Sequence, residues 1–554
     1  MGGGRPRRWQ WGVWLLAILT ICAWPNRPDL LDPDEGRHAE IAREMLAGHS
    51  YLVPRLHGQP YHHKPVAFHW LAAASIAAFG RHTFAPRLPS MAAGLLALAA
   101  TAWWARVAFS PPCAAVAVGM LATTPFFVVL ARLATLDMLF TSLLTAALAW
   151  LGLWLARDPG CRPSIYPFYA LVGLATLVKG PAAIAICGLV AAAAALALGG
   201  WRVILKLRPL AGGLLVLAVA GPWYLAAWQR APDYIEEFLL RHNLARYAGG
   251  GHIGHQHGWF YYPAVLPLIL LPWTPVVGAA VVARARRPAR SPADLYALIW
   301  ASALLAFYWP ASTRLATYLL PAFPPLAVLA ARFALDLDSG GARLPWLAHY
   351  VTAWVLTGAA VGLGAAAVAW WWAGGSWGEL VPAALPLAVA TWWWPKRTGA
   401  PSRLALATLA GTTAALLLAA YGPGARIVNA AKSTRSAAEL VARELPPQAD
   451  LASFHCFQHA LAFYAGRTVR KARLPGEAVH GLAGPGPAAL LTKEKYFEEL
   501  GLKPLPEGVT IRWRGGPGCV LLWKPEASGT AEVGLAEKGG SRTLRRPLGP
   551  ASRF

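Results

Sequence analysis

Residues 138–156 read MLFTSLLTAALAWLGLWLA, a run without a charged residue that ends at Arg157. About 20 apolar residues are enough to cross a lipid bilayer as a helix. Similar runs recur along the chain, in which hydrophobic residues make up 56% and charged residues 14% of the 554 residues. Soluble domains carry about 25% charged residues. The sequence therefore predicts a polytopic membrane protein and excludes a large soluble core.

The apolar runs predict roughly 13 transmembrane helices of about 20 residues each. Arg5, Arg7 and Arg8 precede the first run, which we interpret as an uncleaved span with a cytoplasmic N-terminus. Two long polar loops, 26–85 and 229–258, then lie outside, and the odd number of spans places everything after Tyr421 outside as well. The predicted spans lie near residues 9–24, 87–105, 113–131, 138–156, 166–178, 181–199, 210–228, 259–282, 294–309, 317–333, 346–373, 379–394 and 403–421.

The formal net charge of +24 would suit a nucleic-acid-binding protein, but the position of the charges favours another interpretation. Many Lys and Arg residues stand in short loops between apolar runs, such as the basic segment 201–209 and the loop 284–290. Basic loops fix the orientation of membrane proteins by remaining in the cytoplasm. They also attract anionic lipids. We therefore reject nucleic acid as a partner.

The last part of the chain has a different composition and predicts a small outer domain. Residues 425–527 alternate short strand and helix patterns: a strand near 452–457, a helix near 458–464, and a hairpin from 509–514 and 520–523. We expect an α/β periplasmic domain there, after a transmembrane domain over residues 1–424. Residues 528–554 are rich in Gly, Ser and Arg and predict a disordered basic tail. Cys456 and Cys519 both fall in this small domain, where a disulfide between them is one alternative.

The first outer loop carries the densest set of candidate functional residues. It reads DPDEGRHAEIAREML over 32–46, and YHHKP over 61–65. Acidic residues beside a transmembrane helix are costly unless they are solvated or paired. For Glu40, Arg43 and Glu44 we expect the solvated face of an amphipathic helix. For Asp34 we favour a function.

Other polar residues interrupt the apolar runs, and spacing alone leaves two interpretations open for each. Arg132 and Asp137 either line a polar cavity or form an internal ion pair. Lys179 is either functional or a lysine that extends to the membrane surface. Arg314 either binds phosphate or anchors a helix end.

A sugar carried on a polyprenyl phosphate would suit these residue types. Such a donor needs cations around its phosphate and a carboxylate that takes the proton of the acceptor hydroxyl. Asp34 suits the base. The outer cations that suit the phosphate are Arg37, Lys64, Arg246 and Arg314.

An ordered set of segments resembles the bacterial lipid A aminoarabinose transferases and, more distantly, the protein O-mannosyltransferases of the membrane-bound GT-C glycosyltransferase class. The segments are DPDEGRHAEIAREML (32–46), YHHKPVAFHW (61–70), ARLATLDMLF (131–140), LVKGPAA (177–183), GPWYLAAWQRAPDY (221–234) and STRLATYLLPAFPPLAVL (312–329). The resemblance covers residues 9–335 and implies an inverting transfer from a polyprenyl-phosphate sugar. It implies that Asp34 is the catalytic base and Asp137 a second essential carboxylate. It also implies a substrate-binding set comprising Glu35, Arg37, Tyr61, Lys64, Lys179, Arg246, Arg314 and Tyr318.

The resemblance also bears on a divalent metal, zinc or magnesium. Family members carry Glu before the Lys-Pro pair, where this chain has His63, and that Glu holds a metal together with a histidine that matches His242. Two His residues still suit zinc. The substitution departs from the family pattern and weakens the assignment to aminoarabinose in particular.

The sequence thus predicts an inner-membrane enzyme that moves a sugar, such as 4-amino-4-deoxy-L-arabinose, from undecaprenyl phosphate to lipid A in the periplasm. Protein or another envelope glycan is the alternative acceptor, as in the protein O-mannosyltransferases. A flippase for lipid-linked sugars is a further alternative, but the chain shows no internal repeat such as transporters carry.

Overall fold

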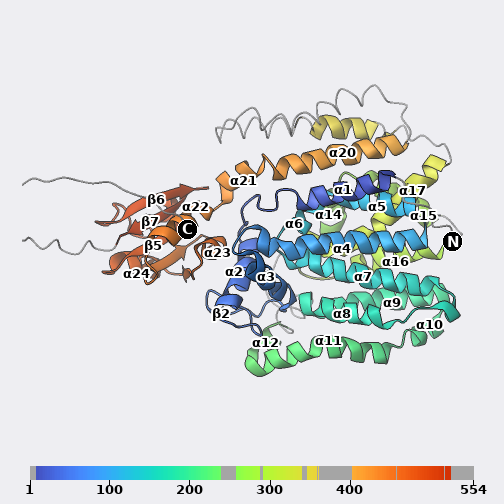
Figure 1. The fold of residues 1–554 in the computed structure, drawn as a ribbon, viewed down its shortest axis with the longest axis horizontal. Coiled ribbons are helices and arrows are strands. Elements are labelled where there is room, and N and C mark those ends of the chain that lie inside the picture. The colour runs from blue at the N-terminus through green and yellow to red at the C-terminus, as the bar shows by residue number, and fades with distance from the viewer. Residues whose placement is uncertain are drawn as a thin grey trace, which may run out of the picture.

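The structure is a computed structural model that describes residues 8–238, 257–286, 291–339, 346–347, 349–358, 360, 402–456, 458–516 and 518–525. Figure 1 shows a block of long helices at one end and a small sheet domain at the other, with α2 and α3 between them. The block contains α1 (Arg8–Cys22), α4 (Phe84–Ala108), α5 (Pro111–Ala122), α6 (Pro125–Arg132), α7 (Leu136–Ala156), α8 (Tyr166–Lys179), α9 (Ala182–Gly199), α10 (Trp201–Lys206), α11 (Pro209–Arg230), α12 (Asp233–Ile235), α14 (Tyr261–Ile269), α15 (Thr274–Arg286), α16 (Pro292–Tyr308), η3 (Ala316–Ala322), α17 (Phe323–Ser339) and α20 (Ser402–Tyr421).

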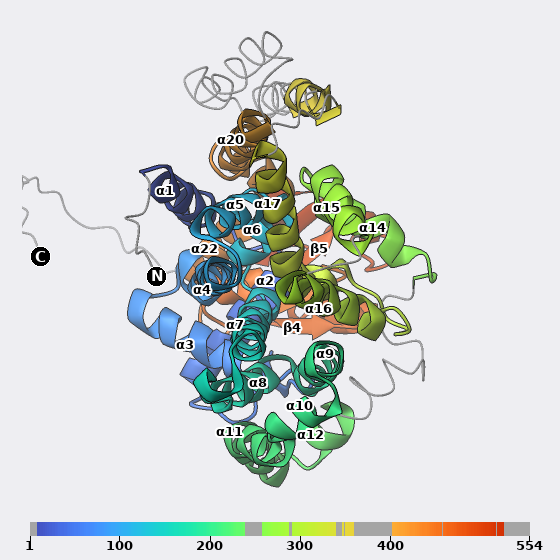
Figure 2. The ribbon, with the colours of Figure 1, turned by 90° about the vertical axis from the view of Figure 1, so that its right-hand side faces the viewer.

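Six helical segments among the described residues are long and apolar enough to cross a membrane, or eight if each of two bent helix pairs counts as one span. Helix α7 is the central one, and it packs against α4 on one side and α8 on the other. Helix α11 covers α8 at the edge of the block, as both views show (Figures 1 and 2). The predicted helix-rich membrane fold is thus confirmed, while the count of 13 spans stays a prediction.

Two of the predicted spans are bent in the structure. The run 113–131 is split into α5 and α6, which meet at 71°, and the run 259–282 is split into α14 and α15, which meet at 116°. Pro125 and Pro272 stand at or just before the second helix of each pair. Proline lacks the N–H that would continue the helical hydrogen-bond ladder, and its ring clashes with the preceding turn.

The predicted polar loop 26–85 holds two helices and a short hairpin. The predicted amphipathic helix is confirmed as α2 (Asp34–Ala47), whose Ile41 and Met45 are buried. A second helix, α3 (Ala67–Phe79), was missed because its apolar stretch is too short to read as a span. The hairpin pairs β1 (Arg55–Leu56) with β2 (Gln59–Pro60). The basic segment 201–209, predicted as a loop, likewise contains α10.

The last described part of the chain forms a five-stranded sheet with the order β4-β3-β5-β7-β6. The three strands β4, β3 and β5 are parallel, and β7 and β6 extend the sheet in antiparallel fashion. The strand, helix and hairpin predicted from the sequence are confirmed. The elements are α21 (Ala425–Lys432), α22 (Arg435–Glu444), β3 (Asp450–Phe454), α23 (His459–Ala465), β4 (Arg470–Ala472), α24 (Pro475–Ala483), β5 (Ala488–Lys493), η5 (Glu494–Tyr496), β6 (Thr510–Gly515) and β7 (Cys519–Lys524).

Alternation along the strands gives this sheet a core on each face. Leu521 and Trp523 of β7 pack toward α22 and α23, while Val520 and Leu522 pack toward α24. Successive side chains of a strand point to opposite faces, so covering both faces completes the domain. The Sγ atoms of Cys456 and Cys519 lie 3.6 Å apart as free thiols, and the disulfide between them stays a prediction.

The sheet domain contacts the helical block through α23, which packs on α2 (Figure 1). The backbone N–H of Ala460, in the first turn of α23, donates to both carboxylate oxygens of Asp32, at 3.1 and 3.2 Å. A carboxylate at a helix N-terminus satisfies free N–H groups and meets the positive end of the helix dipole. Gly36 permits this approach, since a Cβ there would lie 2.6 Å from the nitrogen of Ala460.

Candidate active site

Asp34 is the first residue of α2 and remains open to solvent. Its side chain is 67% exposed, and one carboxylate oxygen lies 3.3 Å from Nη1 of Arg37, one turn further along the helix. A carboxylate in the first turn is stabilised by the helix dipole. Among the described residues the carboxylate is therefore paired with one half-buried cation, and solvent or a substrate can reach it.

Glu35, the next residue, has a different environment, although we predicted both as functional. Both of its oxygens accept hydrogen bonds from Arg87 of α4, each at 2.7 Å, and both side chains are buried. The backbone N–H of Ala134 also donates to Glu35, at 2.9 Å. A bidentate, buried pair of this kind has its hydrogen bonds satisfied within the protein. The geometry gives Glu35 the role of fixing α2 to α4, and substrate binding by this residue stays an untested prediction.

Asp137 and Lys179 meet at the ends of α7 and α8. The Lys179 Nζ atom lies 2.6 Å from a carboxylate oxygen of Asp137, and both side chains are largely buried. The same ammonium lies 5.1 Å from the ring centre of Tyr318, a cation–π distance. Three predicted site residues are thus brought together, and the ion pair that we left open for Asp137 exists, with Lys179 as its partner.

Arg132 and Arg314 both cap helix ends. Arg132 donates to four backbone carbonyls at and beyond the end of α1, from Thr20 to Trp24, at 2.6 to 3.2 Å. Arg314 donates to the carbonyl of Trp309, at 3.0 and 3.1 Å, after the last turn of α16, and to the carbonyl of His257. Arginines at such positions satisfy the last carbonyls of a helix. Of the two interpretations of Arg314, the contacts favour the helix anchor.

Lys64 lies between the two groups of candidate residues. Its charge acts on the Asp137 carboxylate, which also has the Thr317 hydroxyl within hydrogen-bonding reach. The charge of Lys64 acts on His38 of α2 as well. The backbone carbonyl of Lys64 accepts a hydrogen bond from the hydroxyl of Tyr234, at 2.9 Å, which fixes the segment. The charge of Lys64 thus acts both on α2, at His38, and on the ion pair of α7 and α8.

Three residues that position the site were missed by sequence reasoning: Asp32, His38 and Arg87. Burial, the neighbouring imidazole of His69 and the charges of Arg37 and Lys64 hold the pKa of His38 well below its usual range. His38 is therefore neutral at pH 7, and its Nδ1 shares a hydrogen bond with Nε2 of His69 at 3.1 Å. The signal for Arg87 was available, because a charged residue at the start of an apolar run requires a partner.

Tyr61 and His63 lie side by side, with ring centres 4.9 Å apart. Tyr61 is buried and His63 is exposed. His63 is the one predicted metal ligand in the described part of the chain, since His242 lies outside it, as does Arg246. Zinc sites use three or four protein ligands. The described residues thus include one of the two predicted ligands, and we assign no step of a reaction to a metal.

A second group of metal-type ligands occurs on α2 and the hairpin, in Glu40, Glu44 and His57, whose ligand atoms lie within 4.8 Å of one another. Arg43 donates to both oxygens of Glu40, each at 2.7 Å, so a cation already occupies this carboxylate. Glu40 is fully buried, which corrects our prediction of a solvated residue. Burial raises its pKa to about 8 in spite of Arg43.

Several known proteins are similar to this chain in sequence. Residues 63–225 match the family model described as dolichyl-phosphate-mannose-protein mannosyltransferase. The undecaprenyl phosphate-α-4-amino-4-deoxy-L-arabinose arabinosyl transferase of Edwardsiella ictaluri is 31% identical over 335 residues, 59% of this chain and 60% of the relative. The transferase of the same name from Pseudomonas paraeruginosa is 32% identical over 329 residues, 58% of this chain and 59% of the relative. The chain thus spans about three fifths of these curated relatives.

The crystal structure of ArnT from Cupriavidus metallidurans bound to undecaprenyl phosphate has a similar fold. The TM-score is 0.74 at 21% identity, and the match covers 94% of this chain and 98% of ArnT. The likeness extends through the helical block and the sheet domain, since so little of either chain is left out. The resemblance predicted from the ordered segments is confirmed, and the fold is that of the GT-C transferases.

Proposed function

We propose that this chain is an inverting glycosyltransferase that moves a sugar from undecaprenyl phosphate to lipid A at the periplasmic face of the inner membrane. The observation that carries the proposal is the exposed carboxylate of Asp34 at the same end of the helices as Arg37, Lys64 and Lys179. The relatives are named for transfer of 4-amino-4-deoxy-L-arabinose from this carrier, which supports it as the first choice of sugar.

The reaction we propose is a single displacement. The hydroxyl oxygen of the acceptor attacks the anomeric carbon of the sugar and transfers its proton to the Asp34 carboxylate. The bond between the anomeric carbon and the phosphate oxygen breaks, and its electron pair leaves with undecaprenyl phosphate. One displacement inverts the anomeric centre, and a carboxylate base of this kind contributes about 10²- to 10⁴-fold to the rate.

Cations around the phosphate make it a good leaving group, because they stabilise the negative charge that grows on its oxygens. Within the described residues, Arg37 and Lys64 are our candidates for binding the phosphate. Arg246, which lies outside the described residues, is a further candidate because the family resemblance implies it. The carboxylate of Asp137 lies 2.6 Å from the ammonium of Lys179 and fixes the position of this cation relative to the donor phosphate. We infer that Tyr318, beside the same ammonium, contacts the donor.

The topology belongs to the same proposal. About 13 spans, a cytoplasmic N-terminus and a periplasmic sheet domain over residues 425–527 would put Asp34 and Lys64 on the outer side. Basic loops at the opposite end of the helices support this orientation. Labelling of single cysteines from each side tests it, and a Cys introduced at Asp34 that reacts only from the cytoplasm would contradict the proposal.

The decisive experiment is mass spectrometry of lipid A from cells with and without the chain. We expect a pentosamine on lipid A that depends on the chain. The match to the mannosyltransferase family model favours a second candidate, in which the acceptor is protein. Unchanged lipid A together with loss of hexose from periplasmic protein would transfer the assignment to this candidate.

Transfer by the purified chain separates both enzymes from a flippase. A flippase moves a lipid between the two leaflets of a bilayer and forms no new covalent product. Detergent micelles do not have two leaflets. We expect product from undecaprenyl-phosphate sugar and lipid A in micelles with the wild-type chain. A chain that supports the modification in cells, but forms no product in micelles with either acceptor, would contradict an enzyme.

A further inference from the structure

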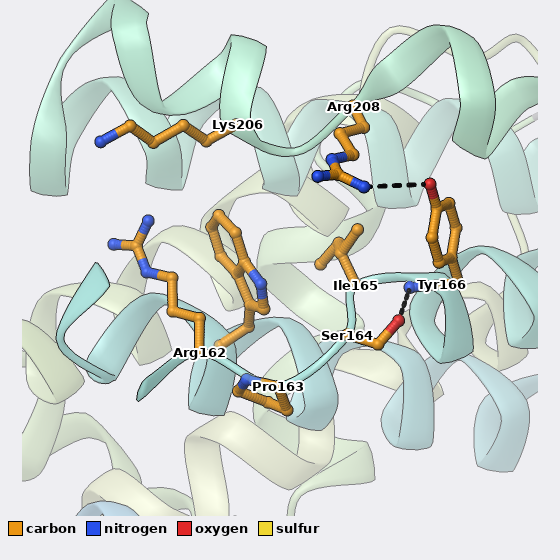
Figure 3. A pocket seen from close by; sticks show the side chains of 8 residues that line it. Arg162, Pro163, Ser164, Ile165, Tyr166, Lys206 and Arg208 are labelled. Carbon is orange, nitrogen blue, oxygen red and sulfur yellow. Dashed lines mark hydrogen bonds between the residues drawn. The ribbon is translucent and has the colours of Figure 1, made fainter. Parts of the chain in front are cut away.

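A cavity of about 470 Å³ opens at the end of the helical block opposite to Asp34 (Figure 3). It lies between the end of α7, the segment before α8, and the junction of α10 with α11. The lining residues are Trp154, Arg162, Pro163, Ser164, Ile165, Tyr166, Lys206 and Arg208. Three of the eight residues are cations and none is an acid, so the cavity suits an anion.

The cations are held in place by uncharged neighbours. The guanidinium of Arg162 stacks over the ring of Trp154 at 4.2 Å, and Arg208 donates to the hydroxyl of Tyr166 at 3.4 Å (Figure 3). Within the ranges that the structure describes, none of Arg162, Lys206 and Arg208 forms an ion pair with a carboxylate. The positive charge of the cavity is therefore not neutralised by the described residues.

The backbone at Arg208 is held in an unfavourable conformation. Its φ angle of 54° lies in the left-handed region, which residues with a side chain seldom adopt. The adjacent carbonyl of Leu207 accepts a hydrogen bond from the hydroxyl of Tyr169 at 3.0 Å, and the carbonyl of Arg208 accepts one from the N–H of Gly212 at 2.9 Å. The fold thus fixes the arginine where α10 gives way to α11, at the mouth of the cavity.

The cavity lies one membrane thickness away from the candidate active site. Asp137 and Trp154 stand on the same helix, about 26 Å apart at about 1.5 Å of rise per residue. The hydrocarbon core of a bilayer is about 30 Å thick. Trp154, Tyr166 and the exposed Trp201 are aromatic residues of the kind that gather at the membrane–water interface. The cavity therefore lies at the level of the lipid headgroups.

An apolar surface continues from the cavity along α11. Leu210, Leu214 and Leu217 follow at helical spacing after Arg208 and are 87%, 68% and 63% exposed. A free phosphate or a soluble nucleotide would make no use of this surface, whereas acyl chains would cover it. The combination of a cationic cavity with an adjacent lipid-facing stripe matches a lipid that has an anionic headgroup.

We propose that this cavity binds the phosphate of an anionic glycerophospholipid, such as phosphatidylglycerol, in the leaflet opposite to Asp34. Arg162, Lys206 and Arg208 bind the phosphate oxygens, Trp154 and Tyr166 flank the headgroup, and the acyl chains lie along α11. This site is separate from the donor site that we propose at the other end of the helices.

Native mass spectrometry of the full chain in detergent tests the site directly. The chain is incubated with phosphatidylglycerol or with phosphatidylcholine, and the bound lipid is counted. We expect wild type to retain phosphatidylglycerol in preference to phosphatidylcholine. The double substitution Arg162→Gln and Arg208→Gln should weaken retention about 25-fold, because each cation near an anionic headgroup strengthens binding about fivefold.

Arg202→Gln is the matched control, since this arginine lies on α10 but does not line the cavity. We expect it to retain lipid as wild type does. Equal retention by the double variant, or an equal loss in Arg202→Gln, would overturn the proposal. A melting temperature of the double variant within error of wild type excludes misfolding, and the two single variants serve if it unfolds.

Competition identifies the source of the phosphate. Displacement of phosphatidylglycerol by millimolar inorganic phosphate would overturn the lipid assignment in favour of a soluble anion. Preferential retention of undecaprenyl phosphate would overturn it in favour of the carrier itself. The readout requires no sugar transfer, so failure of the proposed function and failure of this site can be told apart.

Discussion

The candidate active site and the cationic cavity, at opposite ends of the helical block, differ in how their charged side chains are paired. At the end that meets the sheet domain, Glu35 is paired with Arg87, Glu40 with Arg43, and Asp137 with Lys179, each at 2.6 or 2.7 Å. At the opposite end, the cations of the cavity are supported by Trp154 and Tyr166. The site residues are paired with one another, whereas the cations of the cavity have no carboxylate partner among the described residues, although Arg284 pairs with Asp336 elsewhere at that end.

This difference indicates what each end is prepared to bind. Paired charges hold side chains in fixed positions before a ligand arrives, which is what catalysis on a small reacting centre requires. Uncompensated cations at a membrane surface instead gain a partner from the lipid. Asp34 differs from its neighbours, because its side chain is exposed and, within the described ranges, Arg37 is its one ion-pair partner.

The largest effect is expected from Asp34→Asn. Asparagine keeps the shape but cannot take a proton at neutral pH, so transfer of pentosamine to lipid A should fall by about 10²- to 10⁴-fold. The assay is turnover by purified protein. Asp158→Asn, an exposed acid at the opposite end, is the matched control and should keep wild-type turnover. Turnover by Asp34→Asn at the wild-type rate would remove this residue from its role.

The second effect concerns stability. Glu35→Gln leaves the guanidinium of Arg87 buried without its counter-charge, which costs about 3–5 kcal/mol of folding free energy. Thermal unfolding in detergent should show a clear loss. Glu498→Gln removes an exposed partner of Lys503 and should leave the melting temperature unchanged. A small loss in Glu35→Gln would mean that water enters this part of the site.

The third effect separates positioning from charge. Asp137→Asn leaves Lys179 without its carboxylate, and we expect about a tenfold to hundredfold loss of turnover, less than for Asp34→Asn. The double substitution Asp137→Asn with Lys179→Met removes the unpaired charge, so it should recover melting temperature without recovering turnover. Recovery of both would make the pair purely structural.

The smallest effect is a pH dependence at the contact with the sheet domain. Burial raises the pKa of Asp32 to about 7, against about 3.9 for an unfolded aspartate. Between these values the folded chain holds a proton that the unfolded chain releases, so the stability from this group falls as pH rises from about 4 to about 7. Asp32→Asn does not titrate. Its melting temperature relative to wild type should therefore rise from pH 5 to pH 7.5, and a constant difference would contradict the shift.

Local pattern was enough to predict most of the fold. The run 138–156 predicted α7 to within two residues, and local patterns predicted β3, α23 and the hairpin of β6 and β7, whereas β4 and β5 were missed. The bends at Pro125 and Pro272 were missed because hydropathy is continuous across both positions. Proline at these positions was the sequence signal that could have predicted them, since it interrupts helical hydrogen bonding. The short apolar helix α3 was missed because only apolar runs of about 20 residues were interpreted as helices that cross the membrane.

The partners of the site residues were beyond sequence reasoning. Asp34 and Asp137 could be singled out from their types and from the resemblance, but Asp137 meets Lys179, 42 residues later, and Glu35 meets Arg87, 52 residues later. Such pairs depend on which helices pack against each other, and this cannot be read from the residues near each partner in the sequence. Glu35 and Asp34 are neighbours of the same charge, and only burial distinguishes them.

The contact between Asp32 and the first turn of α23 has a consequence for protein engineering. A chimera that grafts the sheet domain of a relative onto this chain would have to carry along the stretch from Asp29 to Gly36, because Asp29 also pairs with Arg435 and Gly36 leaves room for Ala460. The border between the two exchangeable modules therefore does not run where the membrane ends. It runs inside the first outer loop, immediately beside the carboxylate of Asp34.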